Sequence, residues 1–144
     1  MIRELHFPTP IYIFDHNDPS LNVQLEKDIL NWMNQDKGVT RTNVKGWHST
    51  TDMHTRPEFA RLTKALHEAQ LKIYDEEHLD SEPFLGNMWA NVSPTRLWRE
   101  HHYEPIAGRC IMFPAWLVHC VDPNESNDMR ISVSFNFLQK TMFV

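Results

Sequence analysis

The spacing of apolar residues changes from helical to strand-like in the middle of this chain, and that change restricts the fold more than any other feature. In residues 21–33 and 59–73 apolar side chains recur every three or four residues, which is the period of an amphipathic helix. From Phe84 to Leu138 they alternate with polar side chains, which is the period of a half-buried strand. Helices followed by strands predict an α+β fold, with the helices packed on one face of the β-structure.

Two helices are expected in the first half. The first begins after Asp18 or Ser20, whose side chains can accept hydrogen bonds from free helix N–H groups, and ends near Gly38. The second begins at Pro57, a residue suited to the first turn of a helix. Residues 38–57 have no clean period and many hydroxyl side chains, so they are expected to form a long ordered loop.

The strands are bounded by proline, glycine and acidic turn residues. A chain of 144 residues is long enough for one domain with its own core. We expect a single domain, 1–144, with one strand, two helices and the loop in 1–83 and a β-rich core in 84–144. The expected strands are 9–15, 84–92, 108–114, 115–121 and 129–138.

Charge and composition restrict the partners. The net charge is −5, and no run of Lys or Arg occurs, which argues against nucleic acid or an anionic membrane as a partner. No apolar run approaches the roughly eighteen residues of a spanning helix, and the first residues lack a signal-peptide core, so a cytoplasmic location is expected. The two cysteines, Cys110 and Cys120, give no disulfide framework. Small molecules or other proteins remain as partners.

Polar residues gather on two of the expected strands. Alternation along 129–138 puts Arg130 and Ser132 on the face opposite the apolar one, while His119 lies in an apolar run and is expected to be partly buried. Asn91 shares its strand face with Trp89 and is expected either to contact a ligand or to hydrogen-bond within the sheet.

Each of these residues also has an ordinary structural interpretation. A histidine on an apolar strand is usually a hydrogen-bonded core residue, and an arginine at the start of a strand is usually an exposed charge. Considered together, His119 and Arg130 indicate a different role. An imidazole can hold a divalent metal, while an arginine fork and the Ser132 hydroxyl bind the far carboxylate of a dicarboxylate that chelates the metal.

Five segments resemble, in order and spacing, a family of small 2-oxoglutarate and Fe(II)-dependent oxygenases of marine bacteria and phages, related to the prolyl-hydroxylase type. The resemblance covers nearly the whole chain. It implies a double-stranded β-helix, or jelly roll, with His119 as the distal iron ligand and with Arg130 and Ser132 holding 2-oxoglutarate. Residues 46–49 with His54 either line the pocket entrance or pack as a loop. The segments are "FPTPIYIFD", "NVKGWHSTTDMH", "NMWANVSP", "GRCIMFPAWLVHCVDPN" and "RISVSFNF".

The sequence departs from this family between Pro94 and Gly108. Relatives usually have several dozen residues here, including the first metal ligands and the middle strands, whereas this chain has thirteen, which indicates an internal deletion. His102 and Glu104 have the His-x-carboxylate form, so with His119 they are the candidate replacement triad for Fe(II).

Chain length limits what this interval can build. Only 15 residues lead from Glu104 to His119, too few for the middle strands of an eight-stranded jelly roll. We therefore expect N-terminal helices packed on a shortened jelly roll that is incomplete within one chain. Such a fold leaves an open sheet edge and an uncovered apolar face, which favour a homodimer whose second chain could supply missing ligands or strands.

Three functions follow as hypotheses. The first is a hydroxylase-type oxygenase that holds Fe(II) and 2-oxoglutarate, with no catalytic residue beyond their ligands, and acts on an unidentified small molecule or peptide. The second is a catalytically degenerate, non-enzymatic dimeric module without the iron site. The third is a zinc or other metal site built from His101, His102 and His119.

Overall fold

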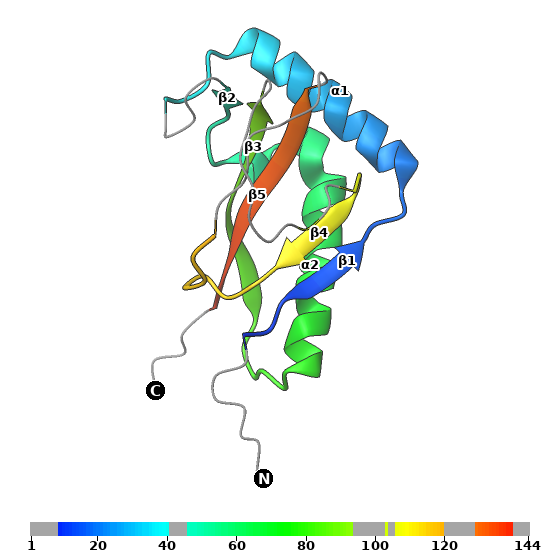
Figure 1. Ribbon diagram of the computed structural model, residues 1–144, viewed down its shortest axis with the longest axis vertical. Helices are drawn as coiled ribbons and strands as arrows, with labels where there is room; N and C mark the ends of the chain where they lie inside the picture. Colours follow the sequence, from blue (N-terminus) through cyan, green and yellow to red (C-terminus); the bar gives the residue numbers. More distant parts are fainter. Residues whose placement is uncertain (1–8, 41–45, 94–102, 104–105, 120–128, 140–144) are drawn as a thin grey trace.

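The computed structural model describes residues 9–40, 46–93, 103, 106–119 and 129–139. Its helices and strands follow the order that the change of period predicts, with most strands after the helices (Figure 1). The elements are β1 (Tyr12–Asp15), α1 (Pro19–Gln35), β2 (Trp47–His48), the 3₁₀ turns η1 (Met53–Thr55) and η2 (Pro57–Phe59), α2 (Ala60–Glu76), β3 (Pro83–Ser93), β4 (Arg109–Met112) and β5 (Arg130–Gln139).

The described strands form two antiparallel sheets. β2, β3 and β5 make a three-stranded sheet in that order, and β1 pairs with β4 in a two-stranded sheet. The long pairing of β3 with β5 runs from Pro83 opposite Gln139 to Ser93 opposite Arg130. Two helices with two small antiparallel sheets confirm the α+β prediction.

One core joins the helices to both sheets. The apolar stripes of α1 and α2 pack against alternate residues of β3 and β4. Four residues of β5 lie against the same cluster: Ile131, Val133, Phe135 and Phe137. Burying each large apolar side chain contributes roughly 1.5–3 kcal/mol, so this cluster is the main source of stability. Its buried members are Ile29, Trp32, Met53, Phe59, Leu62, Leu66, Ala69, Ile73, Met88, Ala90, Val92, Cys110 and Met112.

The N-terminus of α1 is capped as the sequence predicts. The Asp18 carboxylate accepts a hydrogen bond from the backbone N–H of Leu21 at 3.0 Å, so Asp18 is the cap, and Ser20 supports it by donating to the same oxygen at 2.7 Å. At the other end, Gly38 has a φ of +69°, a conformation that favours glycine.

The stretch 38–57, expected to be a loop, also contains a strand. Trp47 and His48 of β2 lie opposite Val92 and Asn91, and the indole Nε1 of Trp47 donates to the Asp36 carbonyl at 2.8 Å. A two-residue strand is too short to show a period, which is why the sequence did not reveal it. Of the two interpretations of residues 46–49, packing describes Trp47, because the centroid of its ring lies 5.5 Å from that of Trp32.

The strand expected at 115–121 is wrong over its described part. Residues 115–119 form a turn, in which the Leu117 N–H donates to the Pro114 carbonyl at 3.0 Å. Trp116 and Val118 are 68% and 96% exposed, and His119, expected to be partly buried, is exposed as well. Alternation alone does not make a strand, since a strand also needs a neighbouring strand to pair with, and none of the described ones pairs here.

Replacing Gly38 by alanine is expected to lower the free energy of unfolding by about 2 kcal/mol. The added Cβ would lie 2.5 Å from the His48 carbonyl oxygen and 2.8 Å from the Trp47 ring, in a backbone conformation that costs non-glycine residues free energy. Urea denaturation measures the change, and Lys37→Ala, an exposed neighbour, is the control. Equal stability of Gly38→Ala and the parent chain would contradict the close packing of α1 on β2.

Candidate functional site

One face of the three-stranded sheet is polar. The apolar residues of β3 and β5 face the helices, so the alternate residues face the other way. The alternation along 129–138 predicted that the polar residues of this strand share a face, and the strand register now places each of them opposite a residue of β3. The pairs are Ser93 with Arg130, Asn91 with Ser132, Trp89 with Ser134, and Asn87 with Asn136. We call them, together with His48 of β2, the polar face.

Arg130 stands at one end of the polar face. Its Nε is buried and has no hydrogen-bond partner among the residues that the structure describes. A buried donor without a partner costs free energy, and a guanidinium presents its N–H groups as a fork that suits a carboxylate. Ser132 lies two residues further along the same strand face, directly opposite Asn91. The structure thus brings Arg130, Ser132 and Asn91 onto one surface, with an unsatisfied cationic donor at its end.

His48 and Trp89 lie on the same face. Their rings are stacked, with centroids 5.9 Å apart and planes at 11°. The imidazole Nδ1 lies 2.6 Å from the Ser49 carbonyl oxygen, and a carbonyl only accepts, so in the neutral ring Nδ1 carries the hydrogen and Nε2 has the lone pair. The sequence left open whether residues 46–49 line a pocket or pack as a loop, and the orientation of His48 depends on the register of β2, which the sequence does not show.

His119 has a similar hydrogen bond but a different setting. Its Nδ1 lies 2.8 Å from the Leu117 carbonyl oxygen, and its ring meets Phe113 edge-on at 4.6 Å. Metal-binding histidines usually donate one ring N–H to an acceptor of this kind and bind the metal through the other nitrogen. His119 therefore has Nε2 available for a metal, on an exposed turn rather than on a strand.

The other predicted metal ligands, His102 and Glu104, lie outside the described residues, as does His101 of the alternative metal site. Within the described ranges, no group of three or more His, Cys, Asp or Glu side chains is placed to hold a metal ion. Burial raises the pKa of Cys110 to about 12, so its thiol stays protonated at neutral pH and is a poor metal ligand there. The described residues fit a carboxylate ligand, but they supply only one of the three predicted iron ligands.

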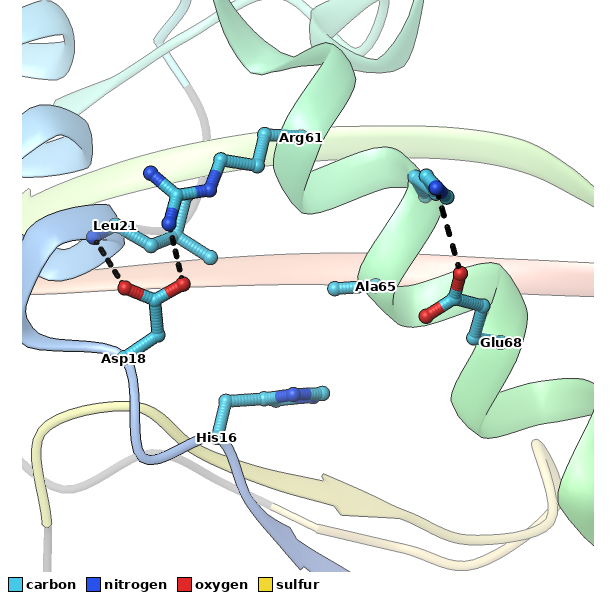
Figure 2. Close-up of a pocket in the computed structure, with 7 residues that line it drawn as sticks. His16, Asp18, Leu21, Arg61, Ala65 and Glu68 are labelled. Atoms are coloured by element: carbon cyan, nitrogen blue, oxygen red, sulfur yellow. Dashed lines mark hydrogen bonds and ion pairs between the residues drawn. The ribbon is translucent and has the colours of Figure 1, made fainter.

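A separate cleft of about 190 Å³ lies where the start of α1 meets α2 (Figure 2). Its charged groups are already paired, Arg61 with Asp18 and Lys64 with Glu68. None of its lining residues belongs to the polar face, and none was a predicted site residue. The lining residues are His16, Asp18, Leu21, Arg61, Lys64, Ala65 and Glu68.

Comparison with known proteins connects the chain to a protein family. Residues 31–136 match the family described as "Putative 2OG-Fe(II) oxygenase". That range includes all six predicted site residues and most of the core. No curated protein matches the chain. Among the helices of the described residues, none is long and apolar enough to cross a bilayer.

Proposed function

The chain belongs to the 2OG-Fe(II) oxygenase family, and we propose that it binds 2-oxoglutarate through Arg130 and Ser132 as a hydroxylase-type oxygenase. The observation that carries the proposal is the buried Nε of Arg130, for which the described part of the chain offers no hydrogen-bond partner. Arg130 lies on the same sheet face as Ser132 and Asn91. A dicarboxylate would supply the missing acceptor.

The chemistry of these side chains suits one end of 2-oxoglutarate. The carboxylate furthest from the keto group would accept two N–H bonds from the Arg130 fork and a third bond from the Ser132 hydroxyl. Asn91 is opposite Ser132 and carries an amide that can donate to the same ligand. Hydrogen bonds between ionised groups are roughly twice as strong as neutral ones, so the Arg130 contact would dominate co-substrate affinity.

For the metal, we propose His119 Nε2 as one ligand, with His102 and Glu104 or a second chain supplying the others. When bound, Fe(II) and 2-oxoglutarate would together supply the chemistry for hydroxylating a C–H bond of the substrate, an unidentified small molecule or peptide, with O₂ as the oxidant and with 2-oxoglutarate converted to succinate and CO₂. Arg130, Ser132 and Asn91 would bind and orient the co-substrate, and His119 would hold the metal. The two sheets are, on this proposal, the remaining parts of a shortened jelly roll.

A second candidate is a non-enzymatic homodimeric module. Two observations favour self-association: among the described strands, β4 and β5 each pair on one side only, and Trp116 and Val118 are exposed. Open strand edges and exposed apolar residues are the usual places where a second chain attaches. A degenerate relative would keep this surface and lose affinity for iron.

Anaerobic mixing of the protein with Fe(II) and 2-oxoglutarate separates the two candidates. The oxygenase is expected to give a visible metal-to-ligand charge-transfer band, because the chelated co-substrate is bound to the metal. His119→Ala is expected to abolish the band, while His67→Ala, which removes an exposed histidine of α2, keeps it. A protein that is dimeric by light scattering and gives no band at high concentration would contradict the oxygenase and support the module.

A further inference from the structure

A row of three residues crosses the polar face. His48 of β2 lies opposite Asn91 of β3, which in turn lies opposite Ser132 of β5. Residues that face each other in this way point to the same side of a sheet, and neighbouring strands are about 4.8 Å apart, so His48 stands roughly 10 Å from Ser132. This separation leaves room for a second ligand group beside a co-substrate held at Ser132.

β2 is fixed in place by contacts on both sides of His48. Trp47 is anchored to the end of α1 through the Asp36 carbonyl, and the Val39 N–H donates to the His48 carbonyl at 2.8 Å. On the other side, the buried Ser49 hydroxyl accepts the Ala90 N–H at 3.0 Å. Since Trp47 packs into the core, the period of a strand turns His48 to the polar face.

His48 offers a specific combination of contacts. Its Nδ1 hydrogen is engaged by the Ser49 carbonyl, so the lone pair of Nε2 can accept a hydrogen bond. The ring is stacked on Trp89 with an angle of 11° between the planes, so the two nearly parallel rings can extend the stack to a planar group of a ligand. The preferred ligand therefore has a planar group and a hydrogen-bond donor.

The charges of the polar face restrict the kind of ligand further. On the strands β2, β3 and β5, Arg130 is the one Lys, Arg, Asp or Glu side chain on the polar face, and a co-substrate would occupy it. An ionic group beside His48 would have no counterion there, which is costly away from water. Near the far end of the face, Asn136 donates to Asn87 at 2.8 Å, so the neutral polar character continues.

We propose that His48 and Trp89 form a substrate-binding surface for a planar, uncharged group that donates an N–H hydrogen bond to His48 Nε2. This assignment rests on the proposed function, because it places the substrate beside 2-oxoglutarate on the same sheet face. His48 acts here as a specificity-determining residue.

The test uses benzamide, a planar and uncharged N–H donor, titrated with and without 2-oxoglutarate. The readout is the NMR signals of the histidine ring nitrogens. Benzamide is expected to shift the His48 Nε2 signal. N,N-dimethylbenzamide lacks the N–H and benzoate is charged, so both are expected to bind at least roughly fivefold more weakly, the factor for one lost hydrogen bond.

Matched variants test whether the acceptor nitrogen of His48 is responsible for benzamide binding. His48→Phe keeps a ring to stack on Trp89 but removes the acceptor, so benzamide affinity is expected to fall roughly fivefold while 2-oxoglutarate affinity stays unchanged. His67→Phe, the same change on the exposed side of α2, is expected to alter neither affinity.

The outcomes for this surface and for the co-substrate site are distinguishable. If 2-oxoglutarate binds but benzamide does not shift the His48 signal, or if the dimethyl compound binds as well as benzamide, the inference about His48 is overturned and the proposed function stands. If benzamide binds as described but 2-oxoglutarate binds neither with Fe(II) nor without it, the surface is supported and the oxygenase proposal fails.

Discussion

Replacing Arg130 by leucine is expected to weaken 2-oxoglutarate binding by roughly 30-fold or more. Removing one partner of a buried, hydrogen-bonded charge pair costs about 2–5 kcal/mol, and 2 kcal/mol corresponds to about 30-fold in affinity. Arg130→Lys keeps the charge but not the fork, so an intermediate affinity is expected. Isothermal titration calorimetry under anaerobic conditions measures all three proteins.

Arg130→Leu is expected to leave the free energy of unfolding largely unchanged, because the Nε of Arg130 has no hydrogen-bond partner among the described residues. The matched control is Arg61→Leu, which removes an exposed guanidinium paired with Asp18 and is expected to leave 2-oxoglutarate affinity intact. Parent-like 2-oxoglutarate affinity in a folded Arg130→Leu variant would remove Arg130 from the co-substrate site.

Replacing Phe59 by alanine is expected to lower the free energy of unfolding by about 3–5 kcal/mol. Phe59 is fully buried where η2 leads into α2, and its ring lies 5.8 Å from that of Trp32. Removing the ring leaves a cavity between the two helices and removes contacts from Trp32. The ring of Trp32 also stacks with the Arg56 guanidinium, whose central carbon lies 3.7 Å from the ring centroid.

Urea denaturation measures this change, with the slope against urea concentration serving as a check that unfolding remains two-state. Leu71→Ala, on the exposed side of α2, is the control and is expected to change stability by about 0.5 kcal/mol or less. A loss below 1 kcal/mol for Phe59→Ala would mean that this junction is not part of the stabilising core.

The helices were predictable because their apolar period is repeated over several turns. Ile29, Trp32, Leu66 and Ile73 lie at three- or four-residue steps within these two periodic segments, and all four are buried in the structure. The cap of α1 was predicted as Asp18 or Ser20, and hydrogen-bond geometry distinguishes them. Local signals therefore gave both helices, but not all of their ends. Residues 57–59, expected to be the first turn of the second helix, form the 3₁₀ turn η2, and α1 ends at Gln35 rather than near Gly38.

The missed and mistaken strands have a common cause. β2 consists of two residues, and its existence depends on the edge of β3 rather than on its own sequence. Residues 115–119 show the reverse case, in which an alternating sequence forms a turn because no described strand pairs with it. Pairing is a long-range property, and the sequence period reports only which side chains could share a face.

The candidate site also combines features that follow from residue spacing with features that depend on strand pairing. That Arg130 and Ser132 share a face follows from their spacing of two, whereas the position of Asn91 opposite Ser132 needed the register of two distant strands. The position of His48 on the polar face likewise follows only from the register of β2 with β3. The roles of His119, His102 and Glu104 in metal binding stay predictions.

The two residues of β2 also restrict how this chain can change in length. Trp47 belongs to the core and His48 to the opposite side of the sheet, while Ser49 is bonded to Ala90. An insertion or deletion of one residue within 47–49 would exchange the two rings between the interior and the polar face. We therefore expect residues 47–49 to tolerate no insertion or deletion, because the packing of the core and the proposed substrate specificity depend on the same three residues.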